Sequence, residues 1–377
     1  MLIVLTSPDA LFRHGTLDAK VASALVSAKK ANNPVAIVSN HPKPNWFDEA
    51  FANSGVQFLQ DVGRQSGKTI QFNAEKLKLK PFDVLVLAAT NVDIQMGKNG
   101  GAVLVAAGWS NDNVVGTLGI RVDDAAQFAQ VIALSSAWKG KWWFSADTAT
   151  YNVRALADLS KYLKPVDQQV FAQKVTTTVK NGGPRLNALL AVTARSILTD
   201  ETTSGADLWG VYPSSNSANN DKETLSDFTH RLRTTVSRVR FAERDHPLFI
   251  RHKPSQKRST AGGGIDRTDP TDQLLTVHLN PHYKGRVRGR RVVVIDDCVT
   301  YGVSFGVAGA LLRAAQARTV TGVALGKFGN QLHQYEISIK GDPYAPLASS
   351  DFKVTSVSGF AGTNNDESQS ALLELIP

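Results

Sequence analysis

The first half of the chain alternates short apolar runs rich in β-branched residues with stretches of helical spacing. Strands are predicted at 2–5, 35–39, 84–88 and 102–106, with a further one at 142–144, and a helix is predicted at 17–32. Strands and helices that alternate in this way form a parallel sheet with helices on both faces. The sequence therefore predicts an α/β fold for this half.

The chain has 377 residues, which is about two and a half times the common domain size. A predicted helical region at 166–198 is interrupted at Asn181-Gly182-Gly183-Pro184, a strong break signal. Strands are then predicted at 208–212, 291–295 and 320–325. We predict two domains, 1–155 and 156–377, each a parallel sheet flanked by helices.

Composition limits the class of protein. Hydrophobic residues make up 42% and charged residues 20%, which is typical of a globular chain and excludes disorder for most of it. The net charge of +9 favours anionic partners, such as phosphate esters, nucleic acid or acidic protein. The single cysteine, Cys298, excludes an internal disulfide. No apolar run is long enough to span a membrane, so we expect a soluble, cytoplasmic protein.

One stretch, 292–304, combines the residue types of an anion site. Val292–Ile295 predicts a buried strand, and Asp296 and Asp297 follow at its carboxyl end, where open α/β sheets bind ligands. Thr300–Ser304 then forms a short loop before a helix, and Gly302 permits positive φ or close backbone approach. A helix start favours a negative charge by about 0.3–1 kcal/mol. Together these features predict a site for a ribose 5-phosphate.

This stretch resembles the phosphoribosyl-pyrophosphate (PRPP) motif of type I phosphoribosyltransferases, D-D-x-x-T-T-G-x-T/S, with Tyr301 in place of the second Thr. The resemblance implies that Asp296 and Asp297 contact the ribose hydroxyls. It also implies a 5′-phosphate loop formed by Thr300, Tyr301, Gly302, Val303 and Ser304. The implied cofactor is Mg²⁺, bound mainly through the substrate, which the two aspartates could help to hold. The implied reaction transfers phosphoribose from PRPP to an unidentified small-molecule acceptor and releases pyrophosphate.

Two flanking segments agree with this resemblance. Ser214, Ser215 and Asn216 follow the strand at 208–212 and are similar to a pyrophosphate loop; a polar surface turn is the alternative. The segment 249–271 is rich in Arg, Lys, Ser and Gly and resembles the flexible catalytic loop of the competence-protein-F branch. Its basic residues are Arg251, Lys253, Lys257 and Arg258, and a solvated basic loop is the alternative.

The N-terminal half resembles a haloacid-dehalogenase (HAD)-like phosphatase in the order of its strands and motifs. Ser39 fits the position after the second strand, and Asp93 fits the last acid of the later motif. The nucleophile position falls at Thr6 or Ser7, however, and an aspartyl-phosphate intermediate needs a carboxylate there. We therefore expect a degenerate HAD-like domain without phosphatase activity, in which Asp93 is a surface or capping residue.

Three functions remain open at this stage. The first is a phosphoribosyltransferase-type enzyme. The second is a non-catalytic regulatory protein that binds PRPP or a nucleotide, with the N-terminal half available for a partner protein or self-association. The third is a nucleic-acid-associated effector, which the charge permits, although no interleaving of aromatic and basic residues supports it. The segment GRQSGKT at 63–69 is one residue short of a phosphate-binding loop and is rejected as one.

Overall fold

A computed structural model describes residues 1–183, 185–236, 243–255 and 266–376. The chain forms two compact units, and each is described by itself. The first contains Met1–Gly140, Asn187–Leu198 and the part of one helix that starts at Arg231; the second contains the other described residues. The division therefore comes earlier than the predicted boundary between 155 and 156, and a strand of the second sheet runs across that predicted position.

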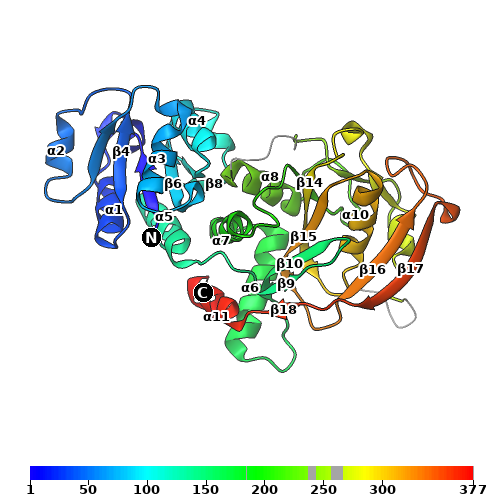
Figure 1. Cartoon of the computed structure of the whole chain (residues 1–377). Coiled ribbons are helices and arrows are strands. Elements are labelled where there is room, and N and C mark those ends of the chain that lie inside the picture. The colour runs from blue at the N-terminus through cyan, green and yellow to red at the C-terminus, as the bar shows by residue number, and fades with distance from the viewer. Residues whose placement is uncertain (184, 237–242, 256–265, 377) are drawn as a thin grey trace. The chain divides into compact units, whose positions relative to one another are not determined.

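The first unit is built on a six-stranded sheet (Figure 1). Its strands are β1 (Ile3–Thr6), β4 (Val35–Ser39), β5 (Gln57–Gln60), β6 (Val84–Ala88), β7 (Val103–Ala107) and β8 (Ile120–Val122). They lie in the order β5-β4-β1-β6-β7-β8, and every pairing is parallel. The strands β1, β4, β6 and β7 are buried along their whole length, as expected for a sheet covered on both faces.

Side-chain caps set where several helices of this unit begin. The helices are α1 (Ala19–Lys30), α2 (Trp46–Ala50), α3 (Lys68–Lys76), α4 (Asn91–Gly100) and α5 (Ala125–Ala137). The carboxylate of Asp18 accepts the N–H groups of Lys20 and Val21, and that of Asp124 accepts the N–H of Gln127. A short hairpin, β2 (Phe12–Arg13) with β3 (Thr16–Leu17), follows β1.

The second unit has a mixed six-stranded sheet. Its strands are β9 (Phe144–Ala146), β10 (Asn152–Asp158), β11 (Leu208–Val211), β14 (Arg291–Val299), β15 (Thr319–Lys327) and β18 (Thr363–Asn364). The order is β11-β14-β15-β10-β9-β18, and the first four strands are parallel. β9 pairs antiparallel with β10, and β18 pairs antiparallel with β9, which corrects the expectation of a wholly parallel sheet. The physical reason is the short connection from β9 to β10, which allows only a hairpin.

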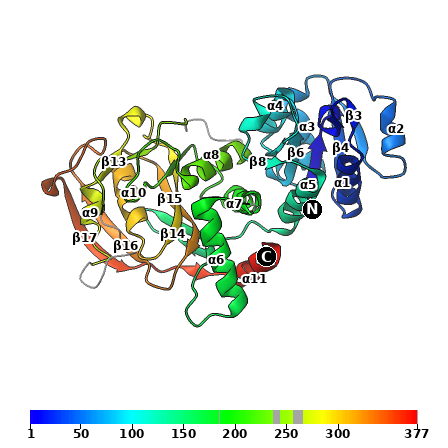
Figure 2. The same cartoon turned by 180° about the vertical axis from the view of Figure 1, so that it is seen from behind.

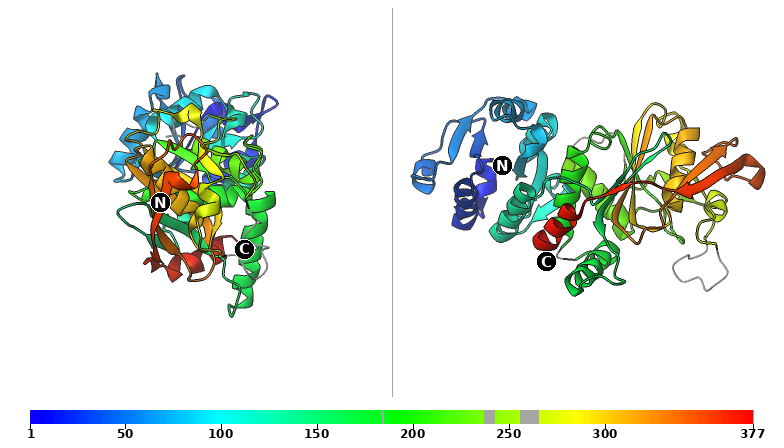
Figure 3. Two further views of the ribbon diagram at one scale, coloured as in Figure 1. Left: turned by 90° about the vertical axis from the view of Figure 1, so that its right-hand side faces the viewer. Right: turned by 60° about the horizontal axis from the view of Figure 1, so that its bottom comes forward.

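Helices and two small ribbons surround this sheet. The helices of this unit are α6 (Val166–Asn181), the first half of α8 (Thr224–Val236), α9 (Thr271–Leu274), α10 (Val303–Ala314) and α11 (Asp366–Leu375), whereas α7 (Leu186–Thr199) belongs almost wholly to the first unit. β12 (Phe249–Arg251) pairs with β13 (Val277–Leu279), and β16 (His333–Ile339) pairs with β17 (Phe352–Gly359). The β16–β17 ribbon lies beside α10 (Figure 3). Within the described residues, no helix is both long and apolar enough to cross a membrane.

The 3₁₀ turns complete the set of elements. They are η1 (Pro8–Leu11), η2 (Arg64–Ser66), η3 (Pro81–Asp83), η4 (Val115–Thr117), η5 (Pro281–Tyr283) and η6 (Ser349–Asp351). The predicted break near 181–184 is confirmed, because α6 ends at Asn181 and α7 begins at Leu186. The C-cap Gly182 at that break has a φ of 73°.

The faces of the second sheet are covered by different helices. Val292 and Val294 of β14 belong to the core that also contains Phe305 and Leu312 of α10. α6 and the start of α8 lie on the other side of the sheet (Figures 1 and 2). The chain therefore leaves β11 toward one face and β14 toward the opposite face. Two adjacent parallel strands whose connections diverge in this way leave a crevice at their carboxyl ends.

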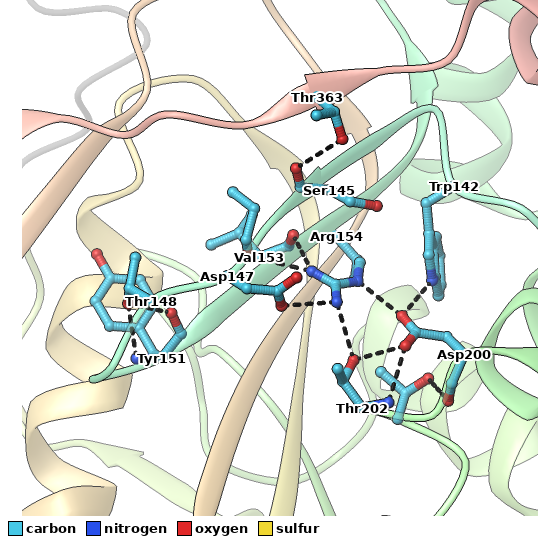
Figure 4. A network of polar contacts seen from close by, with 12 residues as sticks. Trp142, Ser145, Asp147, Thr148, Tyr151, Val153, Arg154, Asp200, Thr202 and Thr363 are labelled. Carbon is cyan, nitrogen blue, oxygen red and sulfur yellow. Dashed lines mark hydrogen bonds and ion pairs between the residues drawn. The ribbon is translucent and has the colours of Figure 1, made fainter.

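A buried arginine ties the antiparallel edge of the second sheet to the loop after α7 (Figure 4). Arg154 of β10 is 4% exposed, and its Nε and Nη2 donate to Asp200 and Asp147, each at 2.7 Å. The indole N–H of Trp142 donates to Asp200 at 2.8 Å. Burial acts to raise the pKa of Asp200, but the charge and hydrogen bonds of Arg154 hold that pKa below its ordinary value near 3.8.

We expect Asp200→Asn to destabilise the second unit by about 3–5 kcal/mol, because the change leaves the Arg154 charge buried and poorly paired. Thermal unfolding checks this. Since the pKa of Asp200 is lowered on folding, the stabilisation is present above the ordinary aspartate pKa and is lost as the pH falls below it. The difference in stability between wild type and variant should therefore become smaller at low pH.

Asp147→Asn is the matched control for this prediction. Asp147 pairs with the same guanidinium at the same distance, but its side chain is 60% exposed. Pairs with an exposed partner contribute about 0–1 kcal/mol. Equal losses in the two variants would show that burial of Asp200 does not set the strength of this contact.

Candidate functional site

A cavity of about 840 Å³ lies in the second unit, at the carboxyl ends of β11 and β14. The end of α6, the loop after β11, the start of α8 and the run from β14 into α10 line it, together with residues from the end of β12 to α9. The lining residues are Val179, Lys180, Tyr212, Pro213, Ser214, Ser215, Lys222, Glu223, Thr224, Leu225, Arg251, Ser255, Arg267, Gln273 and Asp296–Ser304. The structure thus brings together the 292–304 motif and the first two residues of the expected pyrophosphate loop.

The cavity exists because β14 is longer than its neighbour β11. β11 pairs with β14 only as far as Ile295, and the N–H of Tyr212 closes that ladder on the carbonyl of Ile295. On its other side β14 continues to pair with β15 as far as Val299. The predicted strand end at Ile295 is therefore corrected: Asp296 and Asp297 lie within the strand, on the part of its edge that β11 leaves open.

The two aspartates are held close together without a basic partner. The N–H of Asp297 donates to Oδ1 of Asp296 at 2.9 Å, and the N–H of Cys298 donates to Oδ1 of Asp297 at 2.6 Å. Among the described residues, no ion pair is formed by either carboxylate. Burial, and next the charge of Asp297, raise the pKa of Asp296 well above its ordinary value. A bound cation or a set of hydroxyl donors would relieve this cost.

The loop after β14 has the backbone form that a close approach requires. Gly302 has a φ of 81° and is the N-cap of α10, so the expected positive φ is confirmed. A Cβ at this position would lie 2.8 Å from Leu332 Cδ1 and 2.9 Å from the carbonyl oxygen of His333. Only glycine fits there without a shift of β16. The first N–H groups of α10, including that of Ser304, begin directly after this residue.

The ribbon β16–β17 anchors the same loop. The carbonyl of Tyr301 accepts the N–H of His333 at 3.1 Å and the hydroxyl of Tyr335 at 3.2 Å. The ring of Tyr301 lies nearly parallel to that of His333, with centroids 6.3 Å apart, and packs against the core. The bulkier ring is thus accommodated beside the ribbon, while Thr300 and Ser304 line the cavity with it.

The flanking predictions have mixed outcomes. Ser214 and Ser215 line the cavity, whereas Asn216 is exposed and does not. The Ser214 hydroxyl donates to Glu223 Oε1 at 3.1 Å. Lys253 is exposed outside the lining. Lys257 and Arg258 lie outside the described residues.

Arg251 is corrected from a flexible-loop residue to a buried supporting one. It ends β12 and is 4% exposed. Its guanidinium donates to the carbonyls of Pro213 and Ser214, and to Gln273 Oε1 at 2.8 Å. Burial lowers the pKa of Arg251. Because its N–H groups donate to acceptors within the protein, Arg251 supports the loop after β11.

Sequence reasoning missed the basic residues that complete the site. Lys180 ends α6, Lys222 precedes α8, and Arg267 precedes α9; all three line the cavity. Lys180 and Lys222 sit in ordinary polar sequence with no motif around them, whereas Arg267 lies in the predicted flexible-loop segment 249–271 but was not singled out there. Only the crossing of the chain from one face of the sheet to the other brings them together.

In the first unit, one carboxylate organises the ends of β1 and β6. Asp93 is fully buried and accepts the Ser7 hydroxyl and the N–H groups of Ala89 and Thr90, each at 2.9 Å. It also pairs with Arg64, which is 4% exposed. Asp93 closes a capping box with Thr90 at the start of α4, so its expected capping role is confirmed, but it lies in the core instead of on the surface.

The other HAD-like positions carry hydroxyls in structural roles. The Thr6 hydroxyl donates to the carbonyl of Leu87, and the Ser39 hydroxyl accepts the N–H of His41. The rejected GRQSGKT segment contains η2 and leads into α3. Its Gly63 and Arg64 N–H groups donate to the side chain of Asn40. This loop supplies Arg64 to an internal carboxylate.

Comparisons with known proteins found only partial likenesses to solved structures. No protein-family model matches the sequence, and no curated protein does. The cobalt-bound deoxy-D-mannose-octulosonate 8-phosphate phosphatase of Haemophilus influenzae is similar over 37% of this chain and 91% of its own, with 11% identity and a TM-score of 0.31. A HAD-family hydrolase of Streptomyces avermitilis is similar over 37% and 88%, with 14% identity and a TM-score of 0.29.

Gly302→Ala should weaken the site and the second unit together. A left-handed backbone costs a residue with a Cβ about 1–2 kcal/mol, and the contacts with Leu332 and His333 add to that. Thermal unfolding measures the loss. Gly289→Ala is the control, because Gly289 has a φ of 71° with no atom near its Cβ position. If both variants unfold at the same temperature, the close approach to β16 contributes nothing.

Asp93→Ala should destabilise the first unit by about 3–5 kcal/mol, because the Arg64 guanidinium would remain buried without its partner. Unfolding followed by hydrogen exchange of the β1 and β6 amides locates the effect. Asp48→Ala is the control, since its ion pair with Lys43 is exposed and pairs of that kind contribute about 0–1 kcal/mol. Unchanged protection of β1 in Asp93→Ala would contradict this role.

Proposed function

We propose that the second unit is a phosphoribosyltransferase-type enzyme that binds PRPP in the cavity at the ends of β11 and β14. The observation that carries the proposal is that one cavity combines carboxylates, which suit hydroxyl donors, with a helix start, which suits an anion. Asp296 and Asp297 are paired carboxylates that form no ion pair within the described part of the chain, and they suit hydroxyl donors. A glycine-capped helix start beside them suits a phosphate. A sugar phosphate has both groups on one ring.

Different residues of the cavity would contact different parts of PRPP. Asp296 and Asp297 would accept hydrogen bonds from the ribose hydroxyls, and the loop Thr300–Ser304 would donate to the 5′-phosphate. Lys180, Lys222 and Arg267 place positive charge along the remaining wall, where the pyrophosphate would lie. In the reaction, the bond from C1 of the ribose to pyrophosphate breaks and a bond from C1 to an acceptor nitrogen forms. Catalysis would then depend on positioning and electrostatics.

The two aspartates fit a divalent magnesium ion. Their donors are carboxylate oxygens, which Mg²⁺ prefers, and burial beside Asp297 raises the pKa of Asp296, a cost that a bound cation would offset. Asp296 and Asp297 would hold the ion together with the substrate. When bound, Mg²⁺ would neutralise charge on the pyrophosphate as it leaves.

A specific contact favours a second candidate, a protein that binds a ribose 5-phosphate ester without transferring it. Glu223 places a carboxylate in the cavity wall and accepts the Ser214 hydroxyl. Ser214 was expected to face pyrophosphate, and an adjacent carboxylate repels that group. In this alternative the site senses PRPP or a nucleotide, and the first unit contacts a partner protein.

The first unit completes the proposal as a degenerate HAD-like domain. Among the described residues, Asp93 is its only buried acid at the carboxyl ends of β1 and β6, and four donors already saturate it. Phosphatase chemistry needs a carboxylate nucleophile free to react. We also retain the cytoplasmic location and place nucleic acid below small phosphate esters as a partner, since the positive residues described here surround a cavity.

Calorimetric titration with PRPP in the presence of Mg²⁺ tests the site. We expect binding by the wild type and a loss of at least about 100-fold in affinity for Asp296→Asn with Asp297→Asn, because charge-assisted hydrogen bonds contribute about 1.5–3 kcal/mol each. Glu374→Gln is the control for loss of a carboxylate, since Glu374 is exposed on α11 outside the cavity lining. Undetectable wild-type binding at millimolar PRPP would defeat the enzyme, and a further lack of binding to nucleoside monophosphates would defeat the second candidate.

The two candidates separate in a turnover assay. Release of pyrophosphate in the presence of a panel of purine and pyrimidine bases supports the enzyme. Tight binding of PRPP or a nucleoside monophosphate without any release supports the sensor. Glu223→Gln is informative in either case, because removal of the negative charge should strengthen PRPP binding more than binding of ribose 5-phosphate.

A further inference from the structure

A second group of ligand-type side chains lies on the second unit, outside the cavity lining. It consists of Glu243, His246 and His282, and one ligand atom of each lies within 4.8 Å of the others. Glu243 and His246 precede β12, and His282 belongs to η5 after β13. The cluster therefore joins two segments that are distant in the sequence.

The two imidazoles are held next to each other by buried anchors. Their rings stack with centroids 4.1 Å apart and planes 12° apart. The carbonyl of His246 accepts the hydroxyl of Tyr283 at 2.6 Å, and Tyr283 is 1% exposed. The N–H of His282 donates to Asn280 Oδ1 at 3.0 Å. The backbone at both histidines is thus positioned by the core, while their rings remain accessible.

One pair of ligand atoms already has the spacing of a metal site. Oε2 of Glu243 lies 3.3 Å from Nε2 of His282. Zn²⁺ bonds of about 2.0–2.2 Å in a tetrahedral arrangement place neighbouring ligand atoms roughly 3.3–3.6 Å apart. His246 is exposed, so rotation of its side chain can bring a ring nitrogen to the same point.

A cationic group already lies against these ligands. Nη1 of Arg286 is 3.0 Å from Nε2 of His282 and 3.6 Å from Oε1 of Glu243. Since a guanidinium only donates, Nε2 of His282 accepts and presents its lone pair, which is the form that binds a metal. The Arg286 side chain is 45% exposed and can move into solvent.

We propose that Glu243, His246 and His282 bind a borderline divalent ion, with Zn²⁺ as the best fit. Two imidazoles and one carboxylate suit Zn²⁺, whereas Mg²⁺ prefers oxygen ligands alone. Three protein ligands leave a fourth position for water. Binding displaces Arg286 and links the start of β12 to η5. The site is separate from the proposed PRPP cavity, so neither proposal depends on the other.

The test uses the untagged, full-length protein after chelator treatment, in excess Mg²⁺ so that any carboxylate-only site is filled. We expect one Zn²⁺ per chain by calorimetry, and the visible absorption of tetrahedral Co²⁺ when cobalt replaces zinc. His246→Ala and His282→Gln should each weaken Zn²⁺ binding by at least about 10–100-fold, the range that even indirect changes around a metal produce. His41→Ala, at an exposed histidine of the first unit, is the control.

Arg286→Gln should change the affinity for Zn²⁺ in the opposite direction. Removal of the competing guanidinium should strengthen Zn²⁺ binding by about two- to fivefold, the effect of one lost surface charge pair. The proposal is overturned if the histidine variants bind Zn²⁺ as the wild type does, if His41→Ala weakens binding equally, or if no tetrahedral cobalt spectrum appears. Binding that is unchanged or weaker in Arg286→Gln would overturn the displacement of that residue.

Discussion

The unequal length of β11 and β14 is the constraint on which the site depends. Because β11 stops at Val211 and β14 continues to Val299, the last four residues of β14 have a ladder on only one side. The open edge carries Asp296 and Asp297, and the chain then turns through Gly302 into α10. Since the connections after β11 and β14 lead to opposite faces, no helix in the described part of the chain fills the gap between them. The cavity, its negative charge and its helix start follow from this one arrangement.

Buried charges in the two units show what distinguishes a structural carboxylate from one available to a ligand. Asp93 is saturated by a hydroxyl, two backbone N–H groups and Arg64. Asp200 is likewise satisfied by Arg154 and neighbouring donors. Burial and the charge of the adjacent Asp297 raise the pKa of Asp296. A carboxylate whose donors come from the protein stabilises the fold, whereas one left with uncompensated charge in a cavity favours binding.

Local sequence patterns predicted the strands well where the interactions that form them are between residues close in the sequence. β4 and β6 were predicted with their observed bounds, because runs of four and five consecutive apolar residues favour strands that are buried on both faces. β10 was missed, since its run is interrupted by Arg154, a charge that the sequence alone places in solvent. Arg251 was placed in a flexible loop for the same reason. In both cases tertiary acceptors make burial of a guanidinium favourable, and these acceptors come from other parts of the chain.

By itself the sequence determined the α/β class, the four central strands of the first sheet (β4, β1, β6 and β7), and the run of acids, hydroxyls and glycine from Asp296 to Ser304. Those features depend on hydrophobic periodicity and on the conformational freedom of single residues, which act over a few positions. Only the tertiary structure decided that Lys180, Lys222 and Arg267 surround that run, that Asp93 is saturated, and that Glu243 lies beside His282. Such relations depend on the order of strands in a sheet and on the face to which each connection leads, and no local window of sequence contains that information.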